Sequence, residues 1–289
     1  MSTKLQPMRV FRLMMAAAAL SVAACQTTVG PNESMMPGGG QAGTTPRGTT
    51  AEVAQRAQQQ QQLPGGDRLE TARLRTELAF NYFQRGQLGV ALEEIKAALV
   101  ADPNYGTAFN VLGLINMDLG ENAKADEAFR KSLSILPNDS DALNNYGWFL
   151  CQTKRERESI ERFLLALKNP LYATPDKPYL NAGICTQKLG DEATAEDYFR
   201  KAISLDPMNA SANIRLSDIY LRRNDFDRAR LHVDRVNKNY EPSAESLWLA
   251  LRIERRAGDR VAESSFAAQL RRRYPNSEQY LLLQQGKFE

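Results

Sequence analysis

The feature that most constrains this chain is a phrase of small and apolar residues that recurs with a period of 34 residues. The phrase runs Gly-x4-Ala-x3-(Phe/Ile)-x2-(Ala/Ser)-x4-Pro. Its clearest copies are Gly86, Ala91, Ile95, Ala98, Pro103; then Gly120, Ala125, Phe129, Ser132, Pro137; and then Gly190, Ala195, Phe199, Ala202, Pro207. The first two copies lie 34 residues apart at every position, and the third lies 70 residues beyond the second. A repeat of this length is one supersecondary unit, which buries its apolar face by stacking on its neighbours.

The period divides the chain into six units, and Thr174-Pro175 is a two-residue insertion after the third. The units are 72–105, 106–139, 140–173, 176–209, 210–243 and 244–277. Small residues on the first helix let the second helix approach closely, and a proline ends the second helix because it lacks an N–H group. The period and pattern resemble the tetratricopeptide repeat. We therefore expect an all-α, right-handed superhelix of six helix–turn–helix units with a capping helix within 277–289.

The pattern weakens in the third, fifth and sixth units. The departures are Ser159 and Leu171 in the third unit, Ser217 and Asn224 in the fifth, and Leu251 and Glu263 in the sixth. The apolar spacing stays helical there, and no alternating run of β-branched residues predicts a strand.

The first 24 residues differ from all that follow. Lys4, Arg9 and Arg12 precede an apolar run, Leu13–Ala24, and this order is typical of a secretory signal peptide. The run has 12 residues, whereas a helix that spans a membrane needs roughly 20. Its end, with Cys25 after two alanines, resembles the lipobox of bacterial lipoproteins, which implies cleavage before Cys25 and acylation of that cysteine. The alternative is an ordinary signal peptide that is cleaved nearby.

Residues 25–66 are rich in Gly, Pro, Ser, Thr and Gln, which predicts a lipidated N-terminus followed by a disordered linker. Residues 67–289 form the predicted repeat domain. Gln26, rather than an aspartate, follows the lipobox cysteine, which resembles the outer-membrane default of lipoprotein sorting. The chain has 37 basic and 34 acidic residues, and the signal segment holds three of the basic ones, which leaves 34 of each. A mature chain without net charge gives no reason to expect a nucleic-acid partner.

Little in the chain could support catalysis or hold a metal. Cys151 and Cys185 have no CxxC spacing, and His232 is the only histidine, so a zinc site that needs two or three histidines is excluded. The nucleophile-elbow and phosphate-binding motifs GxSxG, GxGxxG and GxxxxGK[ST] are absent. We expect no enzymatic activity, cofactor, metal or small-molecule substrate. For the two cysteines we expect buried free thiols, and a bridge between adjacent repeats is the alternative.

Positions 2, 5, 9 and 12 of the first helix line the concave face in this repeat class. In the first three units they include an apolar strip bordered by two amides. The strip is Phe80, Phe83, Leu114, Met117 and Trp148, and the amides are Asn110 and Asn144. Toward the end of the chain the same positions become charged. An apolar groove edged by amides suits an extended peptide or an amphipathic helix. The alternative is that positions 9 and 12 pack against the first helix of the next repeat.

Several segments together resemble one family. They are the lipobox, the text Asp-Ala-Leu-Asn-Asn-Tyr-Gly-Trp-Phe-Leu at 141–150, Asn-Pro-Leu-Tyr at 169–172 and Arg-Arg-Arg-Tyr-Pro at 271–275. Residues 70–289 resemble the type IV pilus biogenesis and stability lipoproteins, the PilF/PilW pilotin family. Asn144 and Asn145 are the most distinctive part of the likeness, because the repeat itself does not require them.

The resemblance implies a lipoprotein that is anchored in the outer membrane and faces the periplasm. It would bind the secretin subunit of the type IV pilus and pilot its localisation and multimerisation, with the apolar strip as the contact surface. The alternative is a repeat scaffold for other envelope assemblies, such as the cell-wall or β-barrel machinery.

Overall fold

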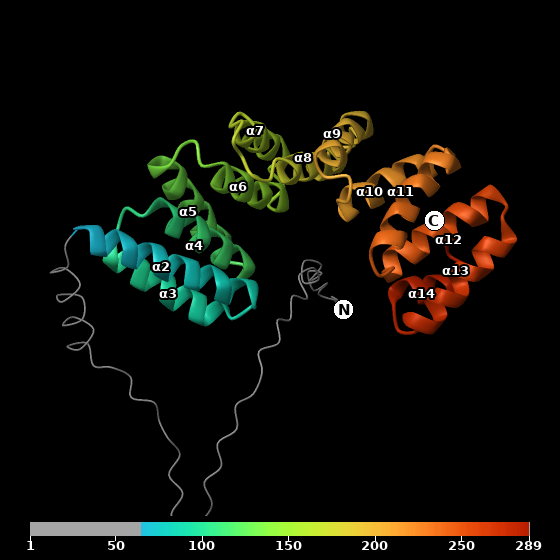
Figure 1. The fold of residues 1–289 in the computed structure, drawn as a ribbon, viewed down its shortest axis with the longest axis horizontal. Helices are drawn as coiled ribbons and strands as arrows, with labels where there is room; N and C mark the ends of the chain where they lie inside the picture. The colour runs from blue at the N-terminus through green and yellow to red at the C-terminus, as the bar shows by residue number, and fades with distance from the viewer. Residues whose placement is uncertain (1–64, 289) are drawn as a thin grey trace, which may run out of the picture. The chain divides into compact units, whose positions relative to one another are not determined.

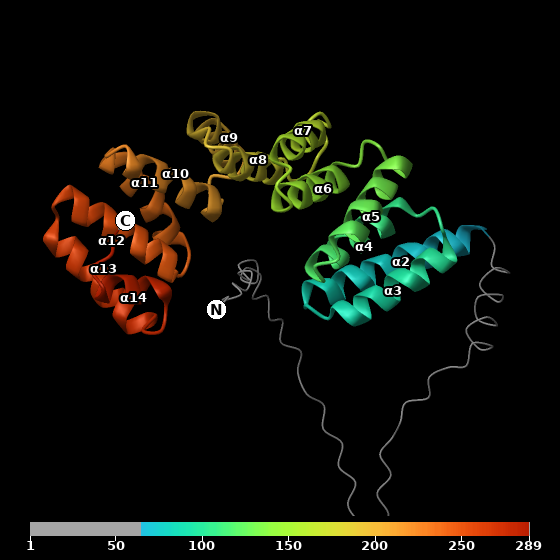
Figure 2. The ribbon, with the colours of Figure 1, turned by 180° about the vertical axis from the view of Figure 1, so that it is seen from behind.

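The computed structural model describes residues 65–288, and within that range all regular structure is helical. The helices form six antiparallel pairs, here called units one to six, followed by a short final helix (Figures 1 and 2). The pairs are α2 (Gly65–Gln84) with α3 (Leu88–Ala101), α4 (Gly106–Asp118) with α5 (Asn122–Ile135), α6 (Ser140–Gln152) with α7 (Glu156–Ala166), α8 (Asp176–Lys188) with α9 (Glu192–Leu205), α10 (Ala210–Arg222) with α11 (Phe226–Asn239), and α12 (Ala244–Ala257) with α13 (Arg260–Arg273). The final helix is α14 (Glu278–Gln284). The predicted all-α tetratricopeptide-repeat fold with a capping helix is confirmed.

The first helices of units two to six begin at residues 106, 140, 176, 210 and 244, which are the starts that the 34-residue frame gives. Side-chain caps fix several of these starts. The carboxylate of Asp139 accepts hydrogen bonds from the backbone N–H groups of residues 141 and 142, and Ser243 forms a reciprocal capping box with Ser246. Only α2 departs from the frame, because it begins at Gly65, ahead of the predicted unit at residue 72.

The packing inside units two and three explains why the repeat places a small residue opposite a bulky one. A Cβ atom on Gly113 would lie 2.6 Å from the ring of Phe129, and one on Gly147 would lie 2.7 Å from the ring of Phe163. Both rings are fully buried. Only glycine lets the two helices of these units come this close, so the sequence marker and the core phenylalanine specify each other.

Successive units are joined by two kinds of contact. The second helix of each unit packs on the first helix of the next, and first helices also contact one another, as α2 with α4, α4 with α6 and α6 with α8 do. The first helices of units one to four therefore line one face of the stack. No helix within residues 65–288 is both long and apolar enough to cross a membrane.

The prediction of two free thiols is wrong. Cys151 on α6 and Cys185 on α8 are joined by a disulfide, with Cα atoms 5.9 Å apart. Cys151 stands at position 12 of unit three and Cys185 at position 10 of unit four. Both are fully buried. The bridge links unit three directly to unit four.

The predicted signal peptide, the acylated Cys25 and nearly all of the predicted linker lie outside the described residues.

Candidate protein-binding face

The predicted apolar strip lies on three neighbouring first helices. Phe80 and Phe83 belong to α2, Leu114 and Met117 to α4, and Trp148 to α6. Because α2 contacts α4 and α4 contacts α6, these side chains come from adjacent rows of one face. The helical spacing of positions 9 and 12 is thus reproduced from unit to unit.

The strip is most open at its beginning. Phe80 is 38% exposed, and its ring stacks on that of Phe83 with centroids 6.1 Å apart. Leu114 and Met117 are half-buried against the core around Phe129, and Trp148 is half-buried against the core that holds the disulfide. Phe83, Leu114, Met117 and Trp148 therefore combine both predicted roles, since they pack on the stack and keep part of their apolar surface uncovered, whereas Phe80 is exposed and stacks on Phe83.

The two amides beside the strip link one repeat to the next. The Asn145 Nδ2 group donates to Asn110 Oδ1 at 3.2 Å, and Asn181 Nδ2 donates to Asn144 Oδ1 at 3.0 Å. Both Asn110 and Asn144 are buried. Each uses only its oxygen in these pairs, and within residues 65–288 neither Nδ2 group donates a hydrogen bond to the protein. An asparagine amide carries two such donors, so the groups are available to the main-chain carbonyls of a ligand.

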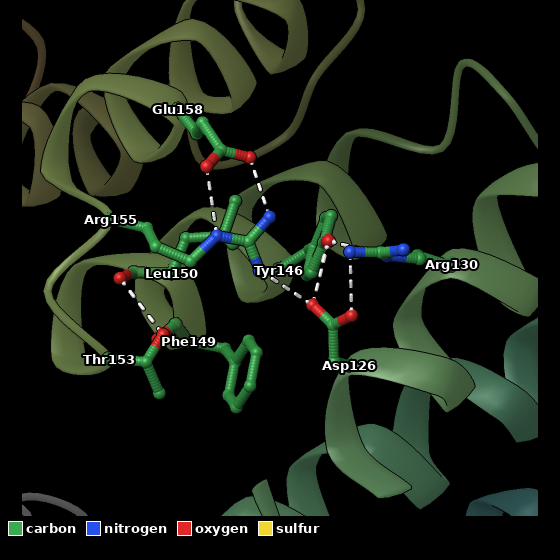
Figure 3. A network of polar contacts seen from close by, with 8 residues as sticks. All are labelled: Asp126, Arg130, Tyr146, Phe149, Leu150, Thr153, Arg155 and Glu158. Carbon is green, nitrogen blue, oxygen red and sulfur yellow. Dashed lines mark hydrogen bonds and ion pairs between the residues drawn. The ribbon is translucent and has the colours of Figure 1, made fainter. Parts of the chain in front are cut away.

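The segment 144–147, which carries the family resemblance, is explained by contacts between units. Asn145 reaches Asn110 of unit two. The Tyr146 hydroxyl donates to Asp126 Oδ1 at 2.9 Å, and Arg155 forms an ion pair with the same carboxylate at 2.9 Å. Arg130 pairs with Asp126 at 2.8 Å, so three side chains converge on one acidic group (Figure 3). This network holds unit three against unit two.

The corresponding positions of the last two units present a charged and partly filled surface. Arg252 lies 3.5 Å from the Asp218 carboxylate, and Arg222 pairs with the same carboxylate at 3.3 Å. Trp248 is only 7% exposed because the ring of Phe288 stacks on it with centroids 5.5 Å apart. Phe288 was missed from the sequence, since it stands outside the 34-residue frame.

His232 has a structural role. Its Nδ1 atom lies 2.9 Å from Asn213 Oδ1, and its ring stacks on Tyr220. Burial, together with Arg235 and Arg228, lowers the pKa of His232 to about 4. In the part of the chain that the structure describes, no group of three or more His, Cys, Asp or Glu side chains is placed to hold a metal ion.

Comparison with known proteins agrees with the fold. Two tetratricopeptide repeat models match residues 76–142 and 188–252. The type IV pilus assembly protein PilF of Pseudomonas aeruginosa is 30% identical over 211 residues, which cover 73% of this chain and 84% of that protein. An uncharacterised protein of Haemophilus influenzae is 28% identical over 39% of this chain and 64% of its own length.

Two solved structures are similar along most of the stack. The structure of PilF from Pseudomonas aeruginosa has a TM-score of 0.70 and 30% identity, and it covers 76% of this chain and all of that one. The crystal structure of PilW, described as a widely conserved type IV pilus biogenesis factor, has a TM-score of 0.68 and 32% identity, over 74% of this chain and 98% of that one.

Proposed function

Because the chain belongs to the family of the type IV pilus assembly protein PilF, we propose that it is an outer-membrane lipoprotein that pilots the secretin of the type IV pilus. In this proposal the repeat domain binds the secretin subunit and promotes its localisation and multimerisation. Acylated Cys25 anchors the protein, with each buried CH2 group of an acyl chain contributing about 0.8 kcal/mol to membrane binding.

The observation that carries the proposal is the uncovered aromatic pair at the start of the strip. Phe80 and Phe83 are stacked on each other, and Phe80 keeps more than a third of its surface open. A partly exposed aromatic pair is typical of the residues that dominate binding energy at protein interfaces. The strip continues through Leu114, Met117 and Trp148, so an extended segment or the apolar face of a helix has anchors along three units.

The amides supply the polar half of the same interface. The Nδ2 groups of Asn110 and Asn144 have no protein acceptor among the described residues, and both stand at position 5, beside the strip. A ligand with accessible main-chain carbonyls would satisfy them, which favours an extended segment over a helix.

The test is the state of the secretin in a strain that lacks this gene, followed on a semi-denaturing gel of outer-membrane fractions. We expect loss of the heat-resistant ring and its return with the wild-type gene. Phe80→Asp should fail to restore the ring, because it places a charge on the apolar anchor. Leu231→Asp is the matched control, since Leu231 is 54% exposed on α11, the second helix of unit five.

Cys25→Ser tests the anchor separately. It should leave the protein folded and still able to co-purify with the secretin, but no longer in the outer-membrane fraction. A normal ring in the deletion strain would exclude piloting and move the protein to the scaffold role in another envelope assembly.

A further inference from the structure

The last residues that the structure describes turn back onto the inner face of unit six. Helix α14 ends at Gln284, and Gly286 follows with a positive φ of 66°. The N–H of Gly286 donates to Leu283 O at 3.1 Å, and the N–H of Lys287 donates to Leu282 O at 3.0 Å. These paired hydrogen bonds form a Schellman turn, which reverses the chain. The turn brings Phe288 onto α12.

Phe288 is held there by three different interactions. Its ring stacks on Trp248 with an interplanar angle of 22°. The guanidinium of Arg255 covers the same ring, with its carbon 3.6 Å from the ring centroid. The main-chain carbonyl of Phe288 accepts a hydrogen bond from Arg252 Nε at 3.0 Å. Aromatic stacking, a cation–π contact and a charge-assisted hydrogen bond therefore all act on one residue.

The three residues that hold Phe288 occupy ligand-facing positions of the repeat. Trp248, Arg252 and Arg255 stand at positions 5, 9 and 12 of unit six. The same positions carry the apolar strip and its amides in units one to three. Phe288 thus occupies on unit six the place that a bound segment would occupy on the earlier units. Its side chain contacts the ring of Trp248, and its carbonyl accepts the hydrogen bond from Arg252.

We propose that the inner face of unit six is a second peptide-binding site, which takes a phenylalanine-bearing segment of a partner protein, and that residues 286–288 are its intramolecular occupant. The site is separate from the strip on units one to three and does not depend on the piloting role. A partner segment binds by displacing the chain's own Phe288.

The charges around the site indicate which segments it accepts. Arg252 and Arg255 each have an acidic neighbour, Asp218 at 3.5 Å and Glu263 at 2.7 Å. A neutral or acidic segment keeps these pairs intact and adds a hydrogen bond from Arg252. The intramolecular occupant carries Lys287 next to Phe288, so one basic residue beside the phenylalanine is tolerated, whereas further basic residues would place like charges beside both guanidinium groups. The site is therefore selective for phenylalanine in a segment without an excess of basic residues.

The experiment uses a fluorescent peptide with the sequence Gln-Gln-Gly-Lys-Phe-Glu, which copies residues 284–289, and the protein carrying Cys25→Ser. Fluorescence anisotropy should show that Phe288→Ala binds the peptide at least tenfold more tightly than the protein with the unsubstituted tail does, because the tethered tail competes at a high effective concentration. A peptide with alanine in place of phenylalanine should not bind. In the Phe288→Ala background, Arg255→Gln should weaken binding at least fivefold. Arg271→Gln, at an exposed arginine of α13, is the matched control and should leave it unchanged.

Two results would overturn the proposal. One is a folded Phe288→Ala protein that does not bind the peptide, since the tail would then act only as a cap. The other is a dimer in solution that Phe288→Ala converts to a monomer, which would make a second copy the occupant. If Phe288→Ala does not fold, hydrogen exchange at residues 286–288 of the unsubstituted tail decides the matter. Faster exchange with millimolar peptide supports displacement, and unchanged exchange rules it out.

Discussion

Units one to three and units five to six use the same helix positions in opposite ways. In the first group, positions 9 and 12 are apolar, and all of them except the disulfide-bonded Cys151 are partly uncovered, from Phe80 on α2 to Trp148 on α6. In the second group, three of the four corresponding residues are charged (Asp218, Arg252 and Arg255), and the ring of Phe288 covers this face in unit six. The 34-residue frame therefore sets which helix positions can face a ligand, but it does not set whether those positions carry apolar or charged residues.

The two groups also differ in how their units are held together. Between units two and three the contacts include the Asn145–Asn110 amide pair and the Asp126 network. Between units five and six, Arg230 forms two hydrogen bonds with the carboxylate of Glu254, and Arg256 reaches Leu221 O and Asn224 Oδ1. Arginine pairing thus replaces neutral amides toward the end of the stack. The Cys151–Cys185 bridge stands at the joint between the two halves.

Breaking that bridge should have the largest effect. The disulfide closes a loop of 34 residues, for which the loss of loop-closure entropy in the unfolded chain corresponds to about 3–4 kcal/mol. We expect Cys151→Ser with Cys185→Ser to lower the free energy of unfolding by that order. Without the bridge, only the packing of unit three on unit four would couple units one to three with units four to six. The single transition in urea should therefore split into two. A single transition with an unchanged midpoint would show that the bridge adds nothing to the coupling.

The second prediction compares the two aromatic rings at opposite ends of the stack. Phe288→Ala removes the stacking on Trp248 and the Arg255 contact, so it should lower the stability of the C-terminal half by about 2 kcal/mol. Phe80→Ala should cost less, about 1 kcal/mol, because 38% of Phe80 is already exposed. Thermal unfolding of both variants provides the measurement. Equal losses would remove the distinction between a filled face and an open one.

The third prediction concerns acid. Folding lowers the pKa of His232 from 6.5 to about 4, so the unfolded chain binds the proton more tightly. The free energy of unfolding is therefore highest above pH 6.5, and it decreases as the pH falls toward 4. Between pH 7.5 and pH 5 the loss should be about 1 kcal/mol, after discounting for the partial exposure of the ring. Because His232 is the only histidine, the protection of backbone amides against hydrogen exchange at pH 5 should fall first in α10 and α11. His232→Gln should abolish the difference between the two pH values, and persistence of the difference would assign it to other groups.

Short-range patterns in the sequence were enough to predict the frame but not the contacts that cross it. The starts of α4, α6, α8, α10 and α12 follow from the spacing of glycine, alanine and proline, since these residues act on the helix that they belong to. The disulfide was only the alternative to two free thiols, because the spacing of the cysteines does not by itself show that position 12 of α6 faces position 10 of α8. Phe288 was not predicted, because its partners on α12 are more than 30 residues away and outside any period. The amide pairs at Asn110 and Asn144 show the same limit, since the donors to these two residues belong to the next unit.

The smallest expected effect concerns the turn between the two helices of a unit. Gly86, Gly120, Gly190 and Gly258 adopt positive φ there, whereas Lys154 in unit three and Asn224 in unit five take the same conformation with φ of 64° and 58°. A left-handed conformation costs a lysine roughly 1–2 kcal/mol, while asparagine tolerates it. Lys154→Gly should therefore stabilise the protein by about 0.5 kcal/mol, because the added flexibility of glycine in the unfolded chain offsets part of the gain. Asn224→Gly should be neutral. Urea unfolding of the two variants measures the contrast. If Lys154→Gly were neutral as well, the turn of unit three would relax without cost, and the third unit would be as well adapted to the frame as the others.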